Sequence, residues 1–241
     1  MSKTADNAPR KSASPSAWPS WAAPVIAFAL SAALLAAVAV LFAADTRVVP
    51  VFLLSALTVA LIACAACPFG ESQPWRLLRA AAPAAGAFFV LLALAAPGSL
   101  PALAVLLTFA LGLAGLVELL ISLRVPPRVA GGTVAILAVL FMTTLFWGTQ
   151  LWRLLGRGAG DAAIHALVHA NPMLAMGDRA IADFNWATGG QLMYARITRL
   201  GQDIPFVHPS WWATSLIYLA VAAVTWPLSW ILQRRTPPPT G

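Results

Sequence analysis

Glu118 is the only acidic residue within the long apolar stretches of this chain. A carboxylate in hydrocarbon is unfavourable, and where one occurs it usually marks a functional site or a paired contact. Gly112 and Gly115 lie on the same stretch, where small residues allow a neighbouring helix to approach closely. The pattern predicts either a structural polar contact or a role in transport or coupling for Glu118.

All three histidines fall in the segment 153–210: His165, His169 and His208. His165 and His169 are four residues apart and share a helix face, so they can present two imidazoles to one metal ion, with His208 as a third ligand. Ala166 stands where a His-Glu-x-x-His motif has its glutamate. We therefore expect histidines that bond to water or lipid headgroups, with no metal and no other cofactor.

The two cysteines, Cys64 and Cys67, form a Cys-x-x-Cys pattern. Redox motifs of this spacing normally begin a helix, where the helix dipole favours the reactive thiolate. These two instead end an apolar stretch, just before Pro68. No histidine follows Cys67, which excludes c-type haem attachment, and we expect reduced, structural thiols.

A polar break between two apolar stretches contains Glu71, Trp75, Arg76 and Arg79. The run Pro74-Trp75-Arg76-Leu77-Leu78-Arg79 predicts a short amphipathic helix on the membrane surface. A simple extension of the following apolar helix, with basic anchors, fits the same residues. Because aromatic side chains often occupy the centres of protein interfaces, we interpret the four residues as candidate contacts with a partner.

The composition places these residues in a membrane protein. The chain is 60% hydrophobic and 10% charged, whereas a soluble domain is roughly 45–50% apolar and about 25% charged. The apolar excess falls in blocks of roughly 20 residues, the length that crosses a bilayer core. The net charge of +7 comes from basic residues between these blocks, which is typical of membrane-flanking positions and not of a nucleic-acid interface.

We therefore predict an all-α, polytopic membrane protein with about six transmembrane helices. Residues 1–20 are expected to form a disordered cytoplasmic tail, 21–152 a five-helix membrane region, 153–210 an external helical loop, 211–232 the last transmembrane helix and 233–241 a cytoplasmic tail. The individual spans are predicted at 21–44, 48–66, 77–96, 102–123, 129–152 and 211–232.

The orientation follows from the basic residues of the short loops. The short loops on the other side hold only Arg47, and the long segment 153–210 counts little in the positive-inside rule despite its five arginines. The rule therefore places both termini in the cytoplasm, and the composition favours a bacterial inner membrane. The basic residues that share the cytoplasmic side are Lys3, Arg10, Lys11, Arg76, Arg79, Arg124, Arg128, Arg234 and Arg235.

The external segment is predicted to form short helices that lie as a lid on the outer leaflet. Asp161 is expected to cap a helix that reaches about Ala170, with Ile164, Leu167 and Val168 on one face. Asn171 followed by Pro172 is the pattern of an N-cap and a first-turn proline. This pattern predicts a second helix, and a third is predicted over about 191–200.

The plan resembles the permease subunits of ABC-2 type transporters: about six spans, both ends inside and a helical outer segment before the last span. The stretch Ala170-Asn171-Pro172-Met173-Leu174-Ala175 is similar to the Asn-Pro element after span five of that family. The stretch Pro205-Phe206-Val207-His208-Pro209-Ser210-Trp211 is similar to the beginning of its last span. Only Glu71 represents the acidic stretch that the family usually carries in its first cytoplasmic loop.

The resemblance implies a membrane-spanning permease subunit of an exporter that has no enzymatic activity of its own. A separate ATP-binding subunit would supply the energy, since the sequence has no Walker A loop. A second copy or a paralogous permease would complete the pathway in the lipid bilayer, with no nucleic acid involved. The alternatives are a structural or assembly subunit of a larger inner-membrane complex, and a membrane metalloenzyme that uses the histidines.

Overall fold

The computed structural model describes residues 21–42, 48–66, 73–96, 98–143, 154–176 and 210–235. The regular structure within these ranges is entirely helical, which confirms the all-α prediction for this part of the chain. Glu71, Cys67, His208, both predicted tails and the predicted third outer helix lie outside the described residues.

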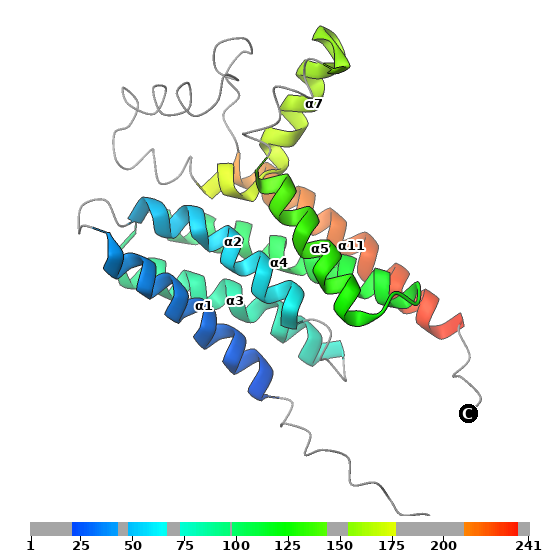
Figure 1. Cartoon of the computed structure of the whole chain (residues 1–241), viewed down its shortest axis with the longest axis horizontal. Helices are drawn as coiled ribbons and strands as arrows, with labels where there is room; N and C mark the ends of the chain where they lie inside the picture. Colours follow the sequence, from blue (N-terminus) through cyan, green and yellow to red (C-terminus); the bar gives the residue numbers. More distant parts are fainter. Residues whose placement is uncertain are drawn as a thin grey trace, which may run out of the picture.

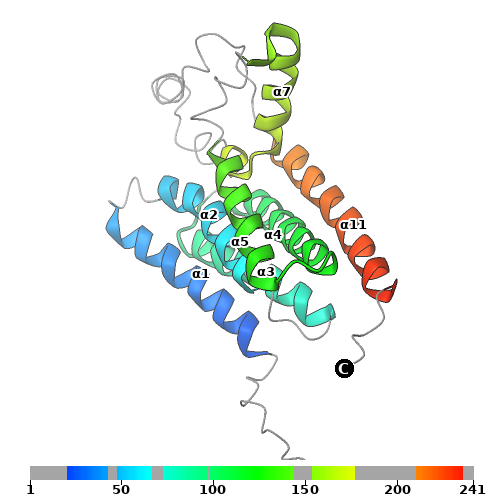
Figure 2. The same ribbon diagram turned by 45° about the vertical axis from the view of Figure 1, so that its right-hand side comes forward.

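Six of the helices run roughly alongside one another, and α7 projects beyond one end of them (Figure 1). In both ribbon views the start of α1 and the end of α11 lie toward the opposite end from α7 (Figure 2). The longer helices of the described ranges are α1 (Ala22–Leu41), α2 (Val48–Ala66), α3 (Gln73–Ala93), α4 (Ser99–Ser122), α5 (Pro127–Met142), α7 (Arg157–Ala170) and α11 (Trp211–Arg235).

Within the described ranges, four helices are long and apolar enough to cross a membrane: α1, α3 from Trp75, α4, and α11 up to Arg234. Two further apolar helices are shorter, covering Pro50–Ala66 of α2 and Pro127–Met142 of α5. Residues 144–152 of the predicted fifth span lie outside the described part of the chain. The apolar helices therefore support a multi-pass membrane protein.

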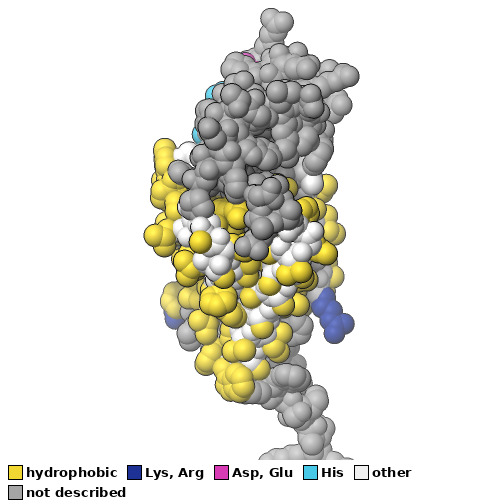
Figure 3. Space-filling model, turned by 90° about the vertical axis from the view of Figure 1, so that its left-hand side faces the viewer, with side chains coloured by type: hydrophobic (Ala, Val, Ile, Leu, Met, Phe, Trp, Pro, Cys, Tyr) yellow, Lys and Arg dark blue, Asp and Glu magenta, His cyan; other side chains and the backbone are white. Residues whose placement is uncertain are grey.

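The outer surface of these helices is apolar. On α1, for example, the exposed side chains include Val25, Ile26, Leu30 and Leu34. Figure 3 shows a band of hydrophobic side chains, with Lys or Arg near one end of the band and histidine near the other. A soluble protein rarely exposes so large an apolar area, whereas a bilayer solvates it.

Glycines set the close packing of α4 against α11, which is the most extensive helix pair in the described structure. A Cβ added at Gly115 would overlap Thr225 Oγ1, and one at Gly112 would lie 3.2 Å from Tyr218. Trp226 Nε1 donates a hydrogen bond of 3.2 Å to the Leu111 carbonyl across the same interface. The expectation that small residues on this stretch allow close approach of a neighbouring helix is confirmed.

Helix α7, the first of the predicted outer helices, begins at Arg157, so the prediction that Asp161 caps it was wrong. Gly156 has a φ of 74° and its carbonyl already accepts a hydrogen bond from Gly160 N at 2.8 Å, which places Asp161 inside the helix. The predicted end at Ala170 is correct. Ile164 and Val168 are buried, as expected for the apolar face.

Asn171 begins the next helix, as predicted. Its Oδ1 accepts hydrogen bonds from the backbone N of Met173 at 2.9 Å and of Leu174 at 3.3 Å, the geometry of an N-cap. The structure describes this helix over residues 172–176, and its predicted continuation to about residue 184 lies outside the described residues. The structure therefore describes only the first part of the predicted lid.

Candidate coupling site at the Arg76–Glu118 ion pair

The candidate site lies where the first turn of α3 meets the last turns of α4. These helices pack against each other and are joined by a short turn at Gly98, which has a φ of 75°. They run antiparallel, so the beginning of α3 lies beside the end of α4. Arg76 is in the first turn of α3, and Glu118 is about one turn from the end of α4.

Arg76 and Glu118 form an ion pair. Arg76 Nη1 donates to Glu118 Oε2 at 2.6 Å, a short charge-assisted hydrogen bond. The Glu118 side chain is 3% exposed, and the Arg76 side chain is 23% exposed. The carboxylate is therefore held inside the bundle, while the guanidinium lies closer to its edge.

The exposure pattern at the start of α3 is the reverse of that in a soluble helix. Leu77 and Leu78 are 43% and 50% exposed, whereas Arg79 is only 4% exposed. Charged side chains in membrane-spanning helices turn toward the bundle interior, and apolar side chains face the lipid. This end of α3 therefore has the character of a membrane-embedded helix.

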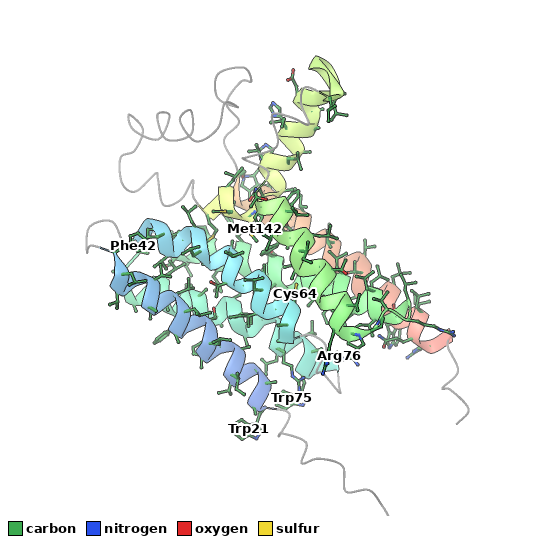
Figure 4. All side chains as sticks on the ribbon, viewed as in Figure 1. Trp21, Phe42, Cys64, Trp75, Arg76 and Met142 are labelled. Atoms are coloured by element: carbon green, nitrogen blue, oxygen red, sulfur yellow. The ribbon has the colours of Figure 1, made fainter. Side chains whose placement is uncertain are left out.

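The four residues that the sequence predicted as partner contacts do not share one environment in the structure. Arg76 pairs with Glu118, Arg79 is buried, and Trp75 is half-buried beside Arg76 at the end of the bundle (Figure 4). Glu71 lies outside the described residues. Since α3 is one continuous helix from Gln73, the extension of the apolar helix is the correct alternative, and the separate surface helix was wrong for the residues from Gln73 onward.

The sequence contained a signal for this pair. Arg76 and Glu118 are equally far along the chain from Pro97, since 97 − 76 and 118 − 97 are both 21. Two helices that form a hairpin bring such positions side by side, because each residue adds the same rise of about 1.5 Å. Sequence reasoning identified both residues but treated them as separate features.

The remaining candidate residues do not assemble into a second site within the described structure. Cys64 is buried near the end of α2, as expected of a structural thiol. His165 is exposed and His169 is half-buried on α7, whereas His208 lies outside the described residues. The described residues include no group of three His, Cys, Asp or Glu side chains that could hold a metal ion.

Three comparisons with known proteins give no relative for this chain: it matches no family model, no curated protein and no solved structure. The resemblance to ABC-2 type permeases therefore rests on the sequence stretches and the helix plan alone. The geometry of the site carries the functional argument.

Proposed function

We propose that this chain is a membrane-spanning permease subunit of an ABC-type exporter that works with a separate ATPase. In this proposal six helices cross a bacterial inner membrane, both termini are cytoplasmic, and a second copy or a paralogue completes the pathway. The chain itself is not an enzyme. The observation that carries the proposal is the partly buried Arg76–Glu118 pair, which joins the beginning of α3 to the end of α4.

The pair supports this function because charges inside a membrane bundle are costly and seldom present without a use. Here the pair ties the beginning of α3, where Trp75 lies, to the end of α4. A partner that moves this end of α3 would therefore move α4 as well. This is the mechanical link that an external ATPase requires.

The energy source follows from the other ionisable groups. Proton-driven transporters usually carry a chain of acidic or histidine side chains through the membrane. Among the described residues, the acidic side chains are Glu118 and Asp161, and Asp161 lies on α7 beyond the bundle. This distribution favours a separate ATPase over an ion gradient.

The placement of the arginines favours a second candidate function. Arg76 pairs with Glu118 and Arg79 is buried in this structure, so a partner that docks here contacts Trp75 more readily than the two guanidinium groups. A structural or assembly subunit, with no transport role, does not need a docking surface for an ATPase at this end of α3. The inward placement of the two arginines is therefore consistent with the structural-subunit function.

Affinity purification of the tagged chain from native membranes distinguishes the two functions. The permease function predicts an ATP-binding subunit among the recovered proteins. The variant Trp75→Ala should lower its recovery, while Leu78→Ala, an exposed neighbour on the same turn of α3, should not. Recovery of no ATP-binding subunit with the wild type would contradict the transporter function and leave the structural subunit as the better account.

A further inference from the structure

A hollow of about 280 Å³ lies between the end of α2 and the beginning of α5. Cys64 and Ala65 line it from α2, and Arg128, Gly131 and Gly132 line it from α5. A Cβ built at Gly132 meets no atom within 4 Å, so this wall of the hollow faces open space. Since one water molecule takes about 30 Å³ of liquid, the hollow has room for a much larger apolar group.

The chemistry of the lining is asymmetric. Arg128 contributes the only charge, and the other lining residues are apolar or glycine. Arg128 is exposed, and no ion pair joins it to another residue in the described part of the chain. A ligand that fits both features has an anionic group for the guanidinium and a hydrocarbon portion for the hollow.

The position of the hollow matches the level of lipid headgroups. Arg128 is in the first turn of α5, and Cys64 is in the last turn of α2. Both helices are apolar, and in the multi-pass arrangement we expect their ends where a membrane changes from hydrocarbon to polar headgroups. Anionic headgroups attract basic residues at this level.

We propose that this hollow is a binding site for one anionic phospholipid. Its phosphate lies on the Arg128 guanidinium, and the first part of an acyl chain lies along the hollow between α2 and α5. The proposal rests on the membrane location of the helices and does not depend on a transport function.

A second hollow, which has no charged lining residue, shows why the Arg128 charge determines which class of ligand binds. It is larger, about 770 Å³, and lies between α1 and α3, near Phe42 and Phe89. Every residue that lines it is apolar. Any acyl chain or apolar helix fits such a surface, whereas the hollow at Arg128 selects for an anionic headgroup.

Native mass spectrometry of the detergent-purified full chain tests the proposal. The probes are phosphatidylglycerol and phosphatidylcholine with identical acyl chains, and inorganic phosphate in a third sample. We expect the wild type to retain phosphatidylglycerol in preference to phosphatidylcholine. Arg128→Gln should reduce this retention about fivefold, the effect of one basic residue near an anionic membrane surface, and Arg128→Lys should keep most of it.

Arg124→Gln is the matched control, because Arg124 is exposed on the same connection but does not line the hollow. It should leave the retention nearly unchanged. Gly132→Leu should fill the hollow and reduce the retention of both lipids. If that variant does not fold, the comparison of Arg128→Gln with Arg124→Gln still tests the proposal.

Three results would overturn the proposal. Equal retention by the wild type and Arg128→Gln would remove the role of the guanidinium. An equal loss with Arg124→Gln would indicate general attraction to the basic end of the protein. Displacement of the lipid by inorganic phosphate would indicate a site for the anion alone.

Discussion

Asn171 reaches 29 residues back along the chain to the last carbonyl of α5: its Nδ2 donates to Met142 O at 3.1 Å. The same amide also contacts the Phe141 carbonyl at 3.3 Å. Since Oδ1 caps the helix that starts at Pro172, one fully buried side chain joins the end of a bundle helix to the start of an outer helix. This gives the Asn-Pro element a physical role.

Asn171→Ala should lower the free energy of unfolding by about 2 kcal/mol, because it removes an N-cap and the side-chain donor to the Met142 carbonyl. Asn171→Asp separates the two roles, since it keeps the capping oxygen but loses the amide donor. We expect amide exchange at the end of α5 to rise in both variants. If the amides at the end of α5 exchange as slowly in Asn171→Asp as in the wild type, the role of Asn171 is limited to capping.

The close contact of α4 with α11 predicts the effect of two glycine substitutions. Gly115→Ala should destabilise the protein by about 1–3 kcal/mol, because the new methyl group overlaps Thr225. Gly132→Ala is the matched control, since its Cβ meets nothing within 4 Å. It should be neutral or add up to about 1 kcal/mol through helix propensity. Thermal unfolding in detergent measures both, and equal melting temperatures would contradict the packing described.

Ala95 has a φ of 49°, a left-handed conformation that glycine adopts more readily. The Ala95 N to Leu92 O and Ala96 N to Leu91 O hydrogen bonds end α3 in a Schellman motif. Ala95→Gly should therefore stabilise the protein by about 1 kcal/mol. Ala93→Gly, in the last turn of the helix, should instead destabilise it by about 0.5–1 kcal/mol. A lower melting temperature for Ala95→Gly than for the wild type would be inconsistent with this backbone.

The membrane orientation is tested by single cysteines in a Cys64→Ser/Cys67→Ser background. Ser99→Cys, at the start of α4, should react with an impermeant maleimide in intact cells. Leu123→Cys, at the other end of the same helix, should react only after the membrane is disrupted. The reverse pattern would invert the topology, because it would put the basic end of the bundle outside.

The sequence predicted the helices well, because charge-free blocks and the prolines and glycines between them are local signals. The predicted bounds of the second span, 48–66, match α2. The start of α7 was missed because Asp161 is a common capping residue, whereas the backbone turn at Gly156 leaves little trace in sequence. The partner of Glu118 was missed because it depends on how α3 and α4 align, a relationship between distant residues that composition and spacing within one helix do not reveal.

The Arg76–Glu118 pair also has an asymmetry that stability measurements can detect. Arg76→Ala leaves a carboxylate that is 3% exposed without this partner, and breaking such a pair costs about 3–5 kcal/mol. Glu118→Gln should cost about 1 kcal/mol, because an amide still bonds to Arg76 and the guanidinium lies near the edge of the bundle. Equal losses in the two variants would contradict this difference in burial.

ATP hydrolysis by the complex purified from native membranes, in nanodiscs and at a temperature where every variant is folded, tests the central claim most directly. If the pair transmits force between α3 and α4, Arg76→Gln should slow hydrolysis about fivefold or more, the range of typical coupling energies. The exchanged pair Arg76→Glu/Glu118→Arg should recover part of the rate. Hydrolysis at the wild-type rate by Arg76→Gln, with equal recovery of the ATP-binding subunit, would contradict the account.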